Sequence, residues 1–213
     1  MIKKILQKIF KTISYSFFLK IHGKIIKSIT SDSDQRIKVI AINIEKNLKY
    51  NIYKISDGRL YTDRIHDTAV ILDNKIIKEP SFQLRYKDAS EIYNSKIEDN
   101  VVFTKGTPRI LKNLKGKVLS MLTGGGANNN YWHWLFDVLP RLDLCSKYIN
   151  LEEINYFLFP SLLRKFQNET LDCLNIPINK RLSSEKFRHI KTNELIVTDH
   201  PVVITGNVSK DMQ

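Results

Sequence analysis

The alternation of strand-like and helix-like segments after Pro108 is the feature that most restricts the fold of this chain. Three apolar runs have the length and composition of buried strands: 117–122, 154–159 and 194–198. Two segments with helical periodicity separate them: 131–148 and 161–174. Strands that alternate with helices pair in parallel through right-handed crossovers. Residues 109–213 are therefore predicted to form an α/β domain with a Rossmann-like open sheet.

Residues 31–108 have a different texture, with short segments rich in Ile, Val and Tyr. The pairs Asp57-Gly58 and Asp73-Asn74 separate some of these segments. Both pairs are typical of hairpin turns, in which Gly58 and Asn74 would adopt a positive φ. We expect a small β-rich subdomain here, ahead of the α/β domain.

The first 30 residues carry most of the excess charge of the chain. They hold seven lysines and no acidic residue, in a chain of net charge +12, so removing them leaves +5. Apolar residues recur between the lysines at helical spacing, which predicts a basic amphipathic helix over residues 1–30. Such a helix can lie on an anionic membrane surface or pack against the protein's own core. No apolar run approaches the roughly 20 residues that cross a bilayer, and the remaining charge does not indicate a nucleic-acid partner.

Cysteine usage indicates a reducing compartment. Cys145 and Cys173 are far apart, and neither belongs to a CxxC pair. Both fall in helical patterns, where we expect them to be small buried apolar side chains. The sequence therefore predicts a cytoplasmic protein, with residues 1–30 available for peripheral contact with the inner face of the membrane.

One segment combines the residue types that carry chemistry. Residues 124–142 follow the predicted strand at 117–122, and ligands bind at this carboxyl end of the strands in open α/β sheets. His133, Asp137 and Arg141 are spaced i, i+4, i+8 and would share one face of an unbroken helix. The carboxylate would make the imidazole a general base, and the guanidinium could hold a phosphate. The alternative is a structural ion pair between Asp137 and Arg141 beside a packing His133.

The loop before this helix contains three consecutive glycines: Gly124, Gly125 and Gly126. A glycine-rich loop at a helix N-terminus can receive a phosphate, but this one matches neither common phosphate-loop motif, and a tight turn explains it equally well. Asn130 is the expected N-cap, and Pro140 is expected to kink or divide the helix. His200 follows the predicted strand at 194–198 and is a second candidate at a strand end.

Residues 130–142, Asn-Tyr-Trp-His-Trp-Leu-Phe-Asp-Val-Leu-Pro-Arg-Leu, resemble the NxxHWxxDxLPRL signature of glycosyltransferase family 61, also called the domain of unknown function 563. The likeness continues through residues 166–177, which are similar to the family's FQxETLxxLGIP helix, and reaches residues 195–201. In total the resemblance covers roughly residues 37–205, in order.

The resemblance implies an inverting transfer of a sugar from a nucleotide-sugar donor to a hydroxyl of a glycan or lipid-linked acceptor. It also implies a GT-B-like scaffold of two Rossmann-like domains, and bacterial members commonly act in capsular or other surface-polysaccharide synthesis. On this reading His133 or Asp137 would be the base, while Arg141 would orient the helix or neutralise phosphate. Seven residues would bind the substrates: Gly124, Gly125, Gly126, Asn130, Tyr131, Trp134 and His200.

Family members usually continue into a second α/β domain that holds most of the donor contacts. This chain stops at Gln213, and we therefore expect it to be the N-terminal part of a glycosyltransferase. A non-catalytic carbohydrate-binding or assembly subunit at the membrane is the alternative, and a membrane adaptor acting only through residues 1–30 is a third. No metal ion is expected, because His133 lacks co-ligands at zinc spacing. No cofactor is expected besides the donor, which is a substrate.

Overall fold

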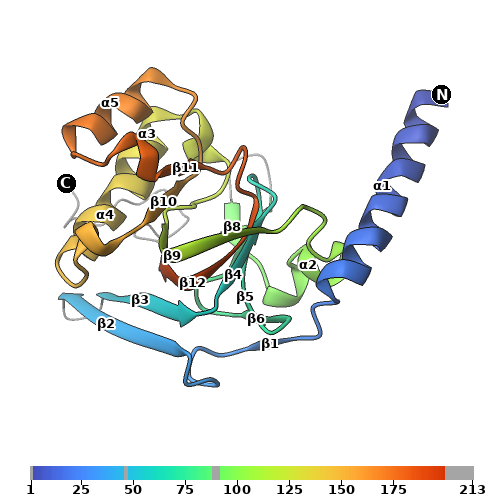
Figure 1. The fold of residues 1–213 in the computed structure, drawn as a ribbon, viewed down its shortest axis with the longest axis horizontal. Coiled ribbons are helices and arrows are strands. Elements are labelled where there is room, and N and C mark those ends of the chain that lie inside the picture. The colour runs from blue at the N-terminus through green and yellow to red at the C-terminus, as the bar shows by residue number, and fades with distance from the viewer. Residues whose placement is uncertain (1, 46–47, 88–91, 200–213) are drawn as a thin grey trace.

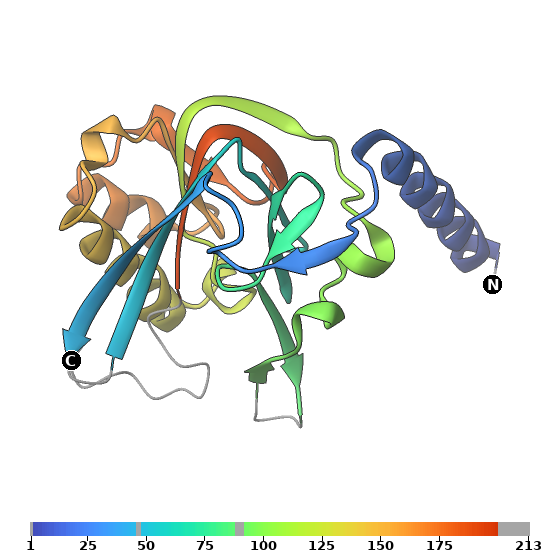
Figure 2. The same ribbon diagram turned by 90° about the horizontal axis from the view of Figure 1, so that it is seen from below.

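The computed structural model describes residues 2–45, 48–87 and 92–199. Within these residues, twelve strands form a mixed sheet (Figures 1 and 2). Its main path runs β1-β6-β5-β4-β12-β9-β10-β11, with β3 and β2 branching from β12, and β7 and β8 branching from β5. The ends of this path are not paired with each other, so the predicted α/β class with an open sheet is confirmed.

The strands have these bounds: β1 Lys27–Ile29, β2 Ile37–Glu45, β3 Leu48–Ser56, β4 Arg59–Thr62, β5 Asp67–Leu72, β6 Lys75–Ile77, β7 Phe82–Tyr86, β8 Ile92–Asn94, β9 Lys112–Ser120, β10 Tyr156–Phe159, β11 Arg181–Ser183 and β12 His189–Thr198. The α-helices have these: α1 Ile2–His22, α2 Val102–Lys105, α3 Tyr131–His133, α4 Leu139–Ser146 and α5 Lys165–Cys173.

Strand β12 joins two halves of the sheet that differ in strand direction. On one side it pairs in parallel with β9, and β10 and β11 continue this parallel half. On the other side its first residues pair antiparallel with β4 and its last residues pair antiparallel with β3. Residues 31–108 and the described part of 109–213 therefore share one continuous sheet.

Helices α3, α4 and α5 cover one face of the parallel half (Figure 1). Because side chains alternate along a strand, one set of residues joins the core beneath the helices: Leu119, Phe157, Phe159 and Ile196. Their neighbours pack with the antiparallel strands: Val118, Leu158, Leu195 and Val197. Cys145 belongs to the helical core as predicted, whereas Cys173 is exposed, so the prediction of a buried side chain there was wrong.

The helix predicted over residues 131–148 is divided into α3, a π-helical turn at Trp134–Val138, and α4. Asn130 caps it as expected, because its side chain accepts a hydrogen bond of 2.9 Å from the backbone N–H of Trp132. Pro140 lies in the first turn of α4, where its missing N–H costs little. The wider π turn comes directly before this proline, at the place where the sequence predicts a division.

Two predicted turn residues have different outcomes. Asn74 adopts φ 58°, as expected for a hairpin turn, but the positive φ next to Gly58 belongs to Asp57, at 55°, so the prediction for Gly58 was wrong. Gly58 is required for another reason. A Cβ atom at this position would lie 2.7 Å from the Cβ of Leu195, which is too close for any side chain.

Helix α1 extends away from the sheet (Figures 1 and 2). It contacts the body through its last turns, where the ring of Phe18 stacks on His22 and His22 contacts His189. None of the side chains at residues 11–22 is buried, so this part does not pack into the core. Several of its apolar side chains are exposed: Ile13, Phe17, Leu19 and Ile21. No helix in the described part of the chain is long and apolar enough to cross a membrane.

Candidate active site

The candidate site lies where the parallel strands end. Strand β9 finishes at Ser120, and the chain then forms the glycine-containing loop that leads to the Asn130 cap and α3. Strand β12, the parallel neighbour of β9, finishes at Thr198 on the same edge. The carboxyl edge of parallel strands is where open α/β sheets bind ligands, so the fold presents this segment at a suitable place.

His133 and Asp137 form a close pair at this edge. The Nδ1 atom of His133 lies 2.7 Å from Oδ2 of Asp137. A carboxylate only accepts hydrogen bonds, so this contact assigns the proton to Nδ1 and leaves Nε2 as an unprotonated acceptor. The His133 side chain is 37% exposed and that of Asp137 is 16% exposed. The pair therefore has the geometry of a general base whose imidazole is oriented by a carboxylate.

Asp137 has a second carboxylate oxygen that does not take part in this hydrogen bond. Its second oxygen, Oδ1, is buried and has no hydrogen-bond partner among the described residues. A buried carboxylate oxygen without a partner is costly, because it has lost its hydration.

Gly126 lies against the imidazole. A Cβ atom on this glycine would come within 2.6 Å of Cδ2 and 2.9 Å of Nε2 of His133. The absence of a side chain therefore lets the loop backbone approach the face of the proposed base. No other residue type could occupy this position without displacing the ring.

The other two glycines serve the packing of the loop. Gly124 has φ 96°, and a Cβ there would lie 2.7 Å from a methyl group of Leu84. Gly125 donates its N–H to the carbonyl of Ile65 at 2.9 Å. A Cβ atom on Gly125 would lie 3.3 Å from the Cα of Ile65, which is a tight contact. These contacts explain both glycines without a bound phosphate. Of the three, Gly126 is the one that touches the His133 ring.

The aromatic residues of the segment separate into a buried and an exposed set. Trp134 has no exposed surface, and its Nε1–H donates to the hydroxyl of Thr170 at 2.8 Å. It belongs to the core, which contradicts its expected role in lining the sugar site. Tyr131 and Trp132 are 51% and 37% exposed, and the ring of Trp132 contacts His133 edge-on at 5.1 Å. Trp132, which the sequence did not indicate as a site residue, is therefore the tryptophan next to His133.

Arg141 does not join the pair at the surface. Its guanidinium is buried and donates to the hydroxyl of Thr198 and to the carbonyl of Leu122, both at 2.7 Å. Burial lowers the pKa of this group to about 10. Arg141 thus ties α4 to the ends of β9 and β12, which agrees with the expected role in orienting the helix. Its guanidinium is buried and is therefore not presented to a phosphate at the surface.

A cluster that local spacing did not indicate lies behind Arg141. Asp199 accepts hydrogen bonds from the hydroxyl of Tyr53 at 2.9 Å and from the side-chain amide of Asn51 at 2.8 Å. Burial raises the pKa of Asp199, although these bonds act in the opposite direction. The pairing of β3 with β12 brings the partners together across about 150 residues of sequence, so no local signal could have found them. His200, the next residue, lies outside the described residues.

Within residues 2–45, 48–87 and 92–199, no three His, Cys, Asp or Glu side chains gather in a way that could hold a metal ion. Asp32 and Asp34 form an Asp-x-Asp sequence, but both carboxylates have partners. Asp34 accepts from Arg36 at 2.8 Å, and Asp32 accepts from the hydroxyl of Thr30.

No family model, curated protein or solved structure matches this chain. The resemblance of residues 130–142 to glycosyltransferase family 61 therefore stays a prediction from the sequence.

Proposed function

We propose that the protein is a glycosyltransferase that transfers a sugar with inversion from a nucleotide-sugar donor to an acceptor hydroxyl, in the synthesis of a surface polysaccharide or related glycan. The observation that carries the proposal is the pair of His133 and Asp137 at the carboxyl edge of β9. The open α/β sheet is compatible with a Rossmann-like domain of the GT-B type, which we include in the proposal.

In the proposed reaction, the acceptor hydroxyl attacks the anomeric carbon from the face opposite the nucleotide. A bond forms between the acceptor oxygen and this carbon, and the bond from the carbon to the diphosphate oxygen breaks. The hydroxyl proton passes to Nε2 of His133, and the nucleoside diphosphate leaves with the bonding electrons. Asp137 stabilises the imidazolium that results, since its carboxylate already accepts the Nδ1 proton.

The exposed aromatic rings support a sugar as the ligand. Trp132 lies beside His133, and Tyr131 contacts the ring of Phe166 at 5.0 Å on α5. The faces of such rings are apolar and match the apolar faces of pyranose sugars. The arrangement therefore combines a surface for a sugar ring with a base for its hydroxyl.

The test is the activity of the full-length gene product with a panel of nucleotide-sugar donors and glycan acceptors. We expect His133→Gln and Asp137→Asn to lower kcat by about 10²–10⁴, the usual contribution of a general base. Asp143→Asn is the matched control, because Asp143 is an exposed carboxylate on α4 whose partner is Lys147. Full activity in both site variants, with product formed, would overturn the proposal.

A non-catalytic glycan-binding subunit is the second candidate, and the exposure of Trp132 is the observation that favours it. If this candidate is correct, the protein binds a glycan, Trp132→Ala weakens that binding, and no nucleotide-sugar donor is consumed. Binding without turnover in the experiment above would therefore select this candidate.

We also propose a peripheral position at the inner face of the membrane, held by α1. The exposed apolar side chains of Ile13, Phe17 and Ile21 support this location, together with the seven lysines of residues 1–30. A lipid-linked acceptor would then be within reach of the enzyme.

A further inference from the structure

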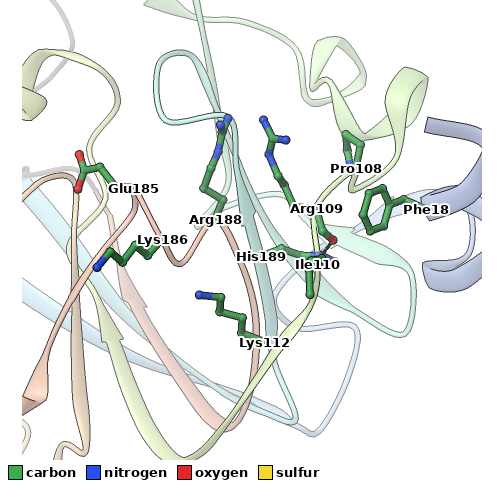
Figure 3. A pocket seen from close by; sticks show the side chains of 9 residues that line it. All are labelled: Phe18, Pro108, Arg109, Ile110, Lys112, Glu185, Lys186, Arg188 and His189. Carbon is green, nitrogen blue, oxygen red and sulfur yellow. Dashed lines mark hydrogen bonds between the residues drawn. The ribbon is translucent and has the colours of Figure 1, made fainter. Parts of the chain in front are cut away.

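A cavity of about 410 Å³ lies at the amino ends of β9 and β12, beside the last turns of α1 (Figure 3). It is at the opposite end of these strands from His133. Four cationic side chains line it: Arg109, Lys112, Lys186 and Arg188. Figure 3 shows the guanidinium groups of Arg109 and Arg188 next to each other, with the two lysines on the other side of the cavity.

These charges are only partly compensated by the protein. The carboxylate among the lining residues, Glu185, is bonded to Arg64. Within the described residues, the side chains of Arg109 and Lys186 make no hydrogen bond or ion pair. Like charges held together in a concave site attract an anion, since each cation then gains a partner.

The positive charges in the cavity affect the pKa of Arg188. Burial and the positive charge of Arg109 lower the pKa of its guanidinium. Arg188 is held in place by donating to the carbonyls of Thr62 and Asp63, at 3.3 and 2.6 Å. It is therefore a fixed cation, whereas Arg109 is free to close on a ligand.

His189 is among the residues that line the cavity, and its imidazole ring is buried. Its Nδ1–H donates to the carbonyl of Arg109 at 3.0 Å, so Nε2 carries a lone pair. This Nε2 atom is buried and has no partner among the described residues. His189 therefore fixes the backbone at Arg109, and a ligand in the cavity meets the four cationic side chains.

The rim of the cavity is apolar. Ile110, which lines it, is 72% exposed, and Phe18 reaches it from α1. Phe17 and Ile21 of the same helix are also exposed. A soluble anion has no need of such a rim, whereas a lipid phosphate arrives with acyl chains beside it.

We propose that this cavity binds the phosphomonoester headgroup of a membrane lipid. A phosphomonoester carries between one and two negative charges near pH 7, more than a phosphodiester, which suits a cavity lined by four cations. The inference rests on the peripheral location proposed above and is independent of sugar transfer. It would fix the orientation of the protein on the membrane, with α1 and the cavity facing the lipid.

The experiment is vesicle co-sedimentation with two compositions of equal surface charge: phosphatidylcholine with phosphatidic acid, a phosphomonoester, and phosphatidylcholine with phosphatidylglycerol, a phosphodiester. We expect the protein to bind the first about tenfold more tightly. Arg109→Gln/Lys186→Gln removes two cations that have no protein partner, and should abolish this preference. Lys38→Gln/Lys191→Gln removes two exposed lysines elsewhere and should retain it.

Each other outcome overturns a defined part of the proposal. Equal binding to both vesicles, or equal losses in the two double variants, would mean that total charge alone decides binding. Absence of binding to either vesicle would overturn the peripheral location together with the headgroup site. Phe17→Ser/Ile21→Ser tests the location separately, since it should weaken binding to both vesicles and leave the ratio unchanged. Binding of inorganic pyrophosphate in solution that Arg109→Gln/Lys186→Gln removes, without vesicle binding, would assign the cavity to a soluble phosphate instead.

Discussion

The two ends of β9 present histidines in opposite environments. At the carboxyl end, His133 is partly exposed and its Nδ1 atom contacts a carboxylate. At the amino end, His189 is buried, its Nδ1–H donates to a neutral carbonyl, and positively charged arginines lie nearby. In the first environment a carboxylate orients the imidazole, whereas in the second burial holds the imidazole neutral. The same side chain is therefore suited to proton transfer at one end and to packing beside an anion site at the other.

One arginine near each end of β9 also differs in its bonding. The arginine at the carboxyl end has several hydrogen-bond partners, whereas the one at the amino end has none for its side chain among the described residues. Arg141, near the candidate active site, is buried and donates to the hydroxyl and carbonyl of Thr198 and to the carbonyl of Leu122. Arg109, at the other end, has no hydrogen-bond or ion-pair partner for its side chain in the described part of the chain. We infer that the cation free to meet an anion is Arg109 and not Arg141. Sequence spacing alone favoured Arg141.

The largest expected effect tests this difference between the arginines. Arg141→Met keeps the length of the side chain but leaves the carbonyls of Leu122 and Thr198 without these donors in a buried place. We expect a loss of about 3 kcal/mol in the free energy of unfolding, measured by urea denaturation. Arg109→Gln should change it by less than about 0.5 kcal/mol, because no contact is lost.

Equal losses in the free energy of unfolding for these two variants would contradict the difference between the two arginines, since Arg109 would then have a structural role as well. A small loss in Arg141→Met would mean that the carbonyls find other donors when the helix shifts. The activity of the folded fraction distinguishes this case, because a shifted α4 would also move Asp137.

A smaller effect concerns pH and distinguishes the two histidines. Burial lowers the pKa of His189 to about 3, below the ordinary value of 6.5 that it regains on unfolding. Between these values the unfolded chain binds a proton that the folded chain does not bind. The free energy of unfolding therefore falls by about 1.4 kcal/mol for each pH unit below 6.5. We expect His189→Gln to remove this contribution, measured as the difference between urea midpoints at pH 7 and pH 5.

His66→Gln is the matched control, because His66 is an exposed histidine whose nearest carboxylate, that of Asp63, lies 4.0 Å away. Its urea midpoints should keep the pH dependence of the unchanged protein. If His189→Gln kept it as well, other buried groups would account for the loss of stability in acid. The imidazole of His189 would then not be held neutral by its burial at the amino end of β9.

Much of the parallel half follows from local sequence. The strand period in β9, β10 and β12 and the cap at Asn130 are read from neighbouring residues. The structure has a strand across each predicted run, although β9 and β12 each begin five residues earlier than predicted. The connection of β12 to β3 and β4 has no such signal, because it depends on pairing between segments more than 100 residues apart. The sequence pattern therefore predicts the elements but not the continuous mixed sheet that they form.

The candidate site shows the same limit within one helix. The i, i+4 spacing predicts the contact of His133 with Asp137 correctly. The π turn at Trp134–Val138 then changes the phase of the helix, and Arg141, one step further, faces the interior. Trp134 was assigned to the sugar site from the resemblance and not from helical spacing, and the structure buries it in the core.

The smallest expected effect tests the contact between the loop and the base. Gly126→Ala places a methyl group 2.6 Å from the ring of His133, which must move away. The φ of Gly126 is not in the left-handed region, so the backbone accepts alanine, and we expect stability to change by less than about 1 kcal/mol. A displaced base transfers protons less well, and we expect kcat to fall about tenfold in the transferase assay. Gly125→Ala is the neighbouring control, because its methyl group would meet Ile65 and not His133. A similar loss of kcat in Gly125→Ala would mean that the shape of the whole loop matters, whereas a loss confined to Gly126→Ala would identify His133 as the group whose position sets the rate.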